Sequence, residues 1–223
     1  MNVLPILLAI LVAIHSAAAD DDCQDDVYQG CQDKLNAALG LSDPQPWHSP
    51  ESFRYQIESQ YENSPLDGTR KVCKAFREFK VCMGDQYQKC INPLHFVLSS
   101  VTPYSAFQFV STFNTLQYTC GAGFQTMLRQ YNCMKNAWNT ANSQQLNACR
   151  TVFERRSNDI PESACSFAST YLDCWENHFR DVCGKGTEDA QFWACEYSRI
   201  NVFTRFPQCS TKCVLPYYGG IIG

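Results

Sequence analysis

Cysteine is the residue type with the greatest capacity for chemistry in this chain, which has 14 cysteines among 223 residues. A thiol can attack a substrate, ligate a metal ion or pair as a disulfide, and the spacing between cysteines separates these uses. No two cysteines are spaced as Cys-x-x-Cys, and an even number favours up to about seven disulfides in an oxidising compartment. The cysteines expected to pair are Cys23, Cys31, Cys73, Cys82, Cys90, Cys120, Cys133, Cys149, Cys165, Cys174, Cys183, Cys195, Cys209 and Cys213.

Two short motifs suggest catalysis, and neither is complete. Cys120-Gly-Ala-Gly resembles the nucleophile segment of papain-like proteases, but the following Cys-aromatic pair is absent and His178 is the only later histidine. Cys174-Trp-Glu-Asn-His178 resembles a helix of secreted phospholipases, but it lacks the doubled cysteine and the aspartate after the histidine. The chain also lacks Gly-x-Ser-x-Gly and His-Glu-x-x-His. We therefore expect no enzyme, no catalytic residue and no cofactor.

Metal binding is not expected either. The acidic cluster Asp20–Asp22, with Asp25 and Asp26, offers carboxylates, but no calcium-binding loop surrounds them. Acidic residues in a first helical turn are explained by the helix dipole alone. The net charge of −4 argues against nucleic acid or an anionic membrane surface as the main partner.

The N-terminus has the pattern of a secretory signal peptide. An apolar run from Val3 to Ile14 precedes Ser16 and three alanines, which predicts cleavage between Ala19 and Asp20. About twelve apolar residues are fewer than the roughly 20 that span a bilayer. The sequence thus predicts a secreted, extracellular protein without a membrane span.

Two stretches have the pattern of long amphipathic helices that organise the rest of the chain. These are Thr69–Cys90 and Ile160–Cys183, each with three cysteines beside or within an apolar face. Cysteines eight or nine residues apart on one helix lie about 12–13 Å apart, whereas a disulfide needs Cα atoms within about 7 Å. Each helix must therefore be bonded to other elements.

The remaining apolar periodicities also indicate helices, and no alternating strand pattern is present. Helices are expected over 27–39, 50–61, 103–116, 124–138, 143–155 and 187–203, with Val152 and Phe203 facing inward. Loops are expected over 42–50 and 63–68, where proline and glycine gather. We predict an all-α, disulfide-stapled domain of about seven to eight helices. Its expected parts are a signal peptide (1–19), an N-terminal helical extension (20–68), a cysteine-rich helical domain (69–213) and a tail (214–223).

The cysteine spacing contains an internal match. Cys73-x₈-Cys82-x₇-Cys90 matches Cys165-x₈-Cys174-x₈-Cys183, and Cys120-x₁₂-Cys133 matches Cys195-x₁₃-Cys209. Two pseudo-repeats would produce this match, and so would the limited positions open to stapling cysteines on helices. The sequence leaves both explanations open.

The cysteine order from Cys73 to Cys209, the Cys120-Gly joint and the interspersed aromatic residues resemble a nematode secreted cysteine-rich family. That family is known as domain of unknown function nineteen. The resemblance covers most of the mature chain, with Cys23, Cys31 and Cys213 outside it. It implies a secreted helical domain and supplies no activity and no functional residues.

Two kinds of binding function remain. An extracellular interaction module, recognising a protein or matrix partner, is favoured by elimination, with loops 41–50 and 62–68 and the Tyr217-Tyr218 tail as contact segments. The alternative is a carrier of a small hydrophobic ligand, because 14 phenylalanines, 11 tyrosines and 4 tryptophans could line a cavity. The same aromatic residues could instead fill a solid core.

Overall fold

The computed structural model describes residues 23–214, so the predicted signal peptide and the Tyr217-Tyr218 segment lie outside the described residues. Within that range the chain forms eleven α-helices and two short 3₁₀-helices, and no strand. The all-α prediction is confirmed. None of these helices is long and apolar enough to cross a membrane.

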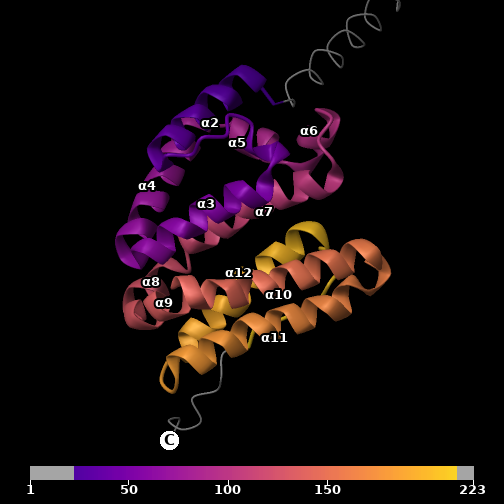
Figure 1. Ribbon diagram of the computed structural model, residues 1–223. Coiled ribbons are helices and arrows are strands. Elements are labelled where there is room, and N and C mark those ends of the chain that lie inside the picture. The colour runs from indigo at the N-terminus through magenta and orange to yellow at the C-terminus, as the bar shows by residue number, and fades with distance from the viewer. Residues whose placement is uncertain (1–22, 215–223) are drawn as a thin grey trace, which may run out of the picture.

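The N-terminal half, residues 23–120, occupies the upper part of Figure 1. Four of its α-helices begin at a proline, whose fixed φ suits the first helical position. Its elements are α2 (Asp25–Leu39), η1 (Pro46–His48), α3 (Pro50–Asn63), α4 (Pro65–Met83), α5 (Gln86–Cys90), α6 (Pro93–Leu98) and α7 (Pro103–Thr119).

The C-terminal half, residues 124–213, forms the lower part of Figure 1. Its helix α11 packs against both α10 and α12, and α12 packs against α7 of the N-terminal half. Its elements are α8 (Phe124–Arg129), α9 (Tyr131–Ala137), α10 (Thr140–Asp159), η2 (Pro161–Ser163), α11 (Ala164–Cys183) and α12 (Glu188–Arg205).

The helices are more numerous than predicted because glycine and turn conformations divide two of the expected ones, and because α6 forms in a segment where no helix was predicted. The predicted helix over 69–90 breaks at Gly84, whose φ of 51° and ψ of −129° favour glycine and end α4. The predicted helix over 124–138 breaks at Gln130, which separates α8 from α9. The helix predicted from Ile160 starts later, at Ala164, after the 3₁₀ turn η2.

The predicted loop over 63–68 is wrong, since only Ser64 separates α3 from α4. Gly68 lies in the first part of α4, where an added Cβ would collide with the backbone carbonyl of Gln60. Glycine therefore permits α3 and α4 to approach closely, and segment 62–68 is not a free recognition loop. The loop over 42–50 contains η1, whose Trp47 packs against Tyr28 and Phe96.

All fourteen cysteines form disulfides, and every disulfide lies within one half. As predicted, no helix is bonded to itself, and the three cysteines of α11 reach α9, α10 and the segment after α12. The pairs are Cys23–Cys90, Cys31–Cys82 and Cys73–Cys120 in the first half, and Cys133–Cys183, Cys149–Cys174, Cys165–Cys209 and Cys195–Cys213 in the second.

The pairing order repeats. Numbered along the chain, the six cysteines of the first half pair 1–5, 2–4 and 3–6. The same order holds in the second half once Cys195 and Cys213, which pair with each other, are set aside. The repeat therefore differs in register from the spacing match: Cys120 corresponds to Cys209, and Cys133 begins the second unit.

The two halves fill their cores with different aromatic residues. Six phenylalanines dominate the first core: Phe53, Phe76, Phe79, Phe96, Phe109 and Phe113. Tryptophan and tyrosine dominate the second: Trp138, Trp175, Trp193, Tyr171 and Tyr197. Their rings contact one another throughout, so aromatic side chains fill both cores.

Candidate binding groove between α10 and α11

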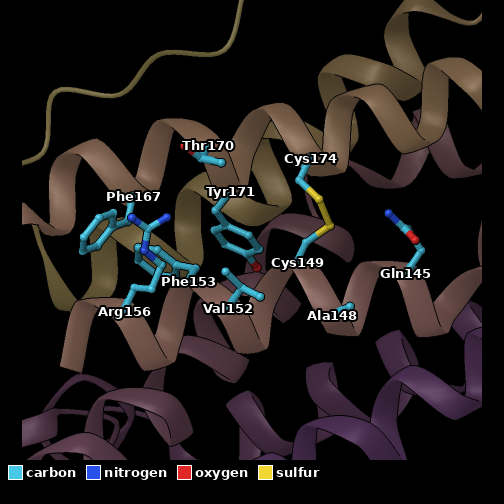
Figure 2. A pocket seen from close by; sticks show the side chains of 10 residues that line it. All are labelled: Gln145, Ala148, Cys149, Val152, Phe153, Arg156, Phe167, Thr170, Tyr171 and Cys174. Carbon is cyan, nitrogen blue, oxygen red and sulfur yellow. A yellow bond between two sulfur atoms is a disulfide. The ribbon is translucent and has the colours of Figure 1, made fainter. Parts of the chain in front are cut away.

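The antiparallel helices α10 and α11 enclose an apolar groove on the surface of the C-terminal half (Figure 2). Its volume is about 220 Å³, and the Cys149–Cys174 disulfide bridges the two helices within it. The lining residues are Gln145, Ala148, Cys149, Val152, Phe153, Arg156, Phe167, Thr170, Tyr171 and Cys174.

Helical spacing explains the floor and the opening of the groove. Phe167 and Tyr171 are four residues apart on α11, and both belong to its buried stripe. Phe153 of α10 stacks on Tyr171, with ring centroids 4.9 Å apart and planes 4° from parallel. The short side chains of Ala148 and Thr170 at the rim leave this aromatic floor uncovered (Figure 2).

Val152 corrects a sequence prediction. It was expected to face inward, but it is 45% exposed and lines the groove. Phe203 of α12 was also expected inward and is 52% exposed. In both cases the adjacent residue, Phe153 or Val202, is buried instead, so the buried face of the helix lies one position away from the predicted residue.

Arg156 places a positive charge at one end of the groove. Its guanidinium carbon lies 4.1 Å from the centroid of the Phe167 ring, a cation–π arrangement that fixes the group over the apolar floor. The side chain is exposed, and it makes no ion pair or hydrogen bond with any other residue between 23 and 214. An anionic group therefore has an available partner beside an apolar surface.

A buried ionic cluster supports the floor from behind. Arg150 donates two hydrogen bonds to the Glu58 carboxylate, at 2.9 and 3.2 Å, and Arg54 of α3 donates a third at 2.6 Å. Tyr197 of α12 donates to the same carboxylate at 2.8 Å. Burial raises the pKa of Tyr197 well above its ordinary value, so the hydroxyl keeps its proton and remains a donor.

The cluster also reaches the groove itself. The Nε of Arg150 donates to the Tyr171 hydroxyl at 3.3 Å, and its guanidinium lies 5.1 Å from the Trp175 ring centroid. The orientation of Tyr171 is thereby tied to Glu58 in the N-terminal half. The groove is built on a floor that both halves hold in place.

A polar hollow continues the groove toward the other end of the helix pair. It shares Gln145, Ala148 and Cys174 with the groove and has a volume of about 570 Å³. Asn142, Asn177, His178 and Asp181 add hydrogen-bonding groups to it. Burial lowers the pKa of His178, whose Nε2 lies 3.4 Å from the Ala137 carbonyl oxygen, so a neutral packed imidazole is favoured.

The cysteines of the two partial catalytic motifs are both in disulfides. Cys120 is bonded to Cys73, and Cys174 is bonded to Cys149, so neither offers a thiolate. Cys23, Asp25 and His95 present ligand-type atoms within 4.8 Å of one another. The Cys23 sulfur is bonded to Cys90, however, which leaves a contact of 3.5 Å between the His95 Nε2 and an Asp25 carboxylate oxygen.

Sequence reasoning missed the groove residues and the ionic cluster. The apolar residues of α10 do not form a clear stripe, and Arg150 and Glu58 resemble ordinary surface helix charges. Comparison of the chain with protein-family models, curated proteins and solved structures finds no match.

Proposed function

We propose that the protein is an extracellular interaction module whose α10–α11 groove binds a short segment of a partner protein. The segment places an apolar side chain on the floor of the groove and a carboxylate beside Arg156. The observation that carries this proposal is an unpaired guanidinium held over an open apolar surface. The disulfides support an oxidising compartment.

The size of the groove favours a side chain over a complete small molecule. Sites that enclose small ligands have volumes of about 300–1,000 Å³, and this groove has about 220 Å³. Burying one apolar side chain there contributes about 1.5–3 kcal/mol. A carboxylate at Arg156 adds a charge-assisted hydrogen bond, and the amides of Asn142, Gln145 and Asn177 can pair with the backbone of the bound segment.

Peptide display tests this proposal without a known partner. We expect random peptides selected on the folded protein to carry a large apolar residue next to aspartate or glutamate. Their affinity is then measured on Val152→Arg, which blocks the groove, and on Thr151→Arg, which adds the same charge at an adjacent exposed position outside it.

We expect Val152→Arg to weaken binding by at least about tenfold, or about 1.4 kcal/mol, and Thr151→Arg to leave it unchanged. Equal affinities for the two variants would place the binding elsewhere and contradict the proposal. So would selected peptides without an acidic residue.

A carrier of a small hydrophobic ligand remains the second candidate, favoured by the apolar lining of the groove. Mass spectrometry under native and then denaturing conditions distinguishes the two. An additional native mass of lipid size, lost in Val152→Arg, would support the carrier. Membership of the nematode secreted family is likewise a proposal, supported by the cysteine order, the Cys120-Gly joint and the interspersed aromatic residues.

A further inference from the structure

A second hollow, between α4 and α8, is lined by cations. Arg70, Lys74, Arg77 and Lys80 follow one another on α4 at intervals of four, three and three residues, which places them along one side of the helix. Together with Cys73, Phe76, Cys120 and Phe124 they line a hollow of about 410 Å³. No acidic residue lines it.

The positive charges in this hollow are weakly neutralised. Arg70 lies 3.6 Å from Asp67, and Lys74 lies 4.0 Å from Glu78. All four of these side chains are at least 58% exposed, and exposed pairs of this kind contribute little. Within the part of the chain that the structure describes, the Arg77 side chain has no ion pair and no hydrogen bond.

The hollow is held in place by rigid neighbours. The Cys73–Cys120 disulfide ties α4 to the end of α7 at its base. Lys80 donates to Gln117 at 2.9 Å and lies 4.8 Å from the centroid of the buried Phe76 ring. A chain of net charge −4 therefore presents a row of four cations along one side of α4, of which Lys80 is held by Gln117 and Phe76.

We infer that this hollow binds a sulfated polysaccharide. The four cations extend over ten residues of helix, or about 15 Å, which suits a linear polyanion with regularly repeated charges. Sulfated glycans are the linear polyanions of the oxidising milieu in which seven disulfides persist. Single-stranded nucleic acid would need aromatic platforms for its bases, but Phe76 is buried beneath Lys80, which leaves only Phe124.

This inference does not depend on the groove between α10 and α11, because the two sites share no residue. The partner inferred for the hollow on α4 is a component of the extracellular matrix. The net charge of −4 argues against a polyanionic partner. The local charge of α4, however, is positive and so opposite in sign to that of the whole chain.

The test is titration of the oxidised protein with a heparin-derived octasaccharide and with the same chain after desulfation. We expect binding of the sulfated chain that weakens steeply between about 0.05 and 0.2 M salt. The double variant Lys74→Gln/Arg77→Gln should weaken it by about tenfold or more, since each exposed cation contributes to counterion release.

The matched control is Arg155→Gln/Lys185→Gln, which removes two exposed charges outside the hollow. We expect it to change the affinity by less than about twofold. The inference is overturned if the wild-type protein does not bind, if both double variants weaken binding equally, or if the desulfated chain binds as well. Tighter binding of a single-stranded oligonucleotide of equal charge would also overturn it.

Discussion

The two halves of the molecule have the same disulfide order and different interiors. In both, cysteines pair 1–5, 2–4 and 3–6, and α4 corresponds to α11 as the helix that carries the third and fourth cysteines. The first interior is packed with phenylalanine, whereas the second contains three tryptophans, and a buried ionic cluster lies where the two interiors meet. The same disulfide order is thus compatible with two different sets of core residues, and the surfaces of the two halves differ as well.

The difference at the surface is seen on the two central helices, α4 and α11. On α4 the open hollow is basic, whereas on α11 the open groove is apolar with a single guanidinium at its end. The disulfides determine where helices meet, and the residues at the rim determine what each junction can bind.

No disulfide crosses the junction between the halves, which are linked by the backbone at residues 121–123 and otherwise by noncovalent contacts. Tyr61 of α3 contacts Trp138 with ring centroids 5.6 Å apart, and Asn201 of α12 donates to Ser111 of α7 at 2.9 Å. Glu58 joins the same junction through Arg150. The halves are stapled internally and joined by packing, hydrogen bonds and one ionic cluster.

Reduction should have the largest effect, because it removes the feature that both halves share. Each disulfide closing a long loop contributes about 2–5 kcal/mol, and seven together exceed the roughly 5–15 kcal/mol of net stability typical of a domain. We expect loss of cooperative melting and of most helicity in reductant, measured by far-UV circular dichroism. A sharp melt of the reduced protein would contradict the account.

Glu58→Gln should have the next largest effect, since it acts on the junction itself. The substitution leaves Arg150 buried without a counter-charge, and Arg54 keeps only the nearby Glu154 carboxylate, so we expect a cost of about 3–5 kcal/mol. Urea unfolding of the oxidised protein measures the loss. As a control, Glu78→Gln removes an exposed partner of Lys74 and should cost less than about 0.5 kcal/mol.

Arg156→Gln distinguishes the groove of the second half from the basic hollow of the first. We expect it to weaken acidic, apolar peptides selected by display by about tenfold while leaving their neutral amide analogues unaffected. Arg155→Gln, at the adjacent exposed position outside the groove, should leave both affinities unchanged. Equal losses in the two variants would mean that only the net charge of α10 matters.

Glu154→Gln should have the smallest effect, on the pH dependence of stability. Burial raises the pKa of Glu154, and the positive charge of Arg54 opposes the shift. As pH rises, the Glu154 carboxyl therefore loses its proton at a lower pH in the unfolded chain than in the folded protein. The stability that the protonated carboxyl contributes to the fold is lost as pH rises from the ordinary glutamate pKa to the raised pKa. The variant should be more stable than the wild-type protein at neutral pH, with a flatter pH profile of stability in that window. An unchanged profile in denaturant titrations would contradict this.

The sequence was sufficient to predict the helical class and the way its cysteines are used. Periodicity placed Phe167 and Tyr171 on one face of α11, and helical rise excluded bonds between cysteines of one helix. Pro103 and Thr102 marked the start of α7, where the Thr102 hydroxyl accepts a hydrogen bond from the Ser105 backbone. These features depend on neighbours within a few residues.

The pairing scheme and the sites depend on residues far apart in the chain. Fourteen cysteines allow on the order of 10⁵ connectivities, and helical spacing alone does not choose among them. Arg150 and Glu58 are 92 residues apart, so neither reveals its partner in the sequence. The groove exists because Ala148 and Thr170 are short on two different helices, which a single periodic pattern does not reveal.

The central claim, that two halves with the same disulfide order have no disulfide between them, is tested most directly by mapping the disulfides. Peptides of the unreduced protein would be separated and identified by mass spectrometry. We predict seven linked pairs, with Cys149 bonded to Cys174 and none joining residues 23–120 to residues 133–213. A single linked pair between the two ranges would contradict the account.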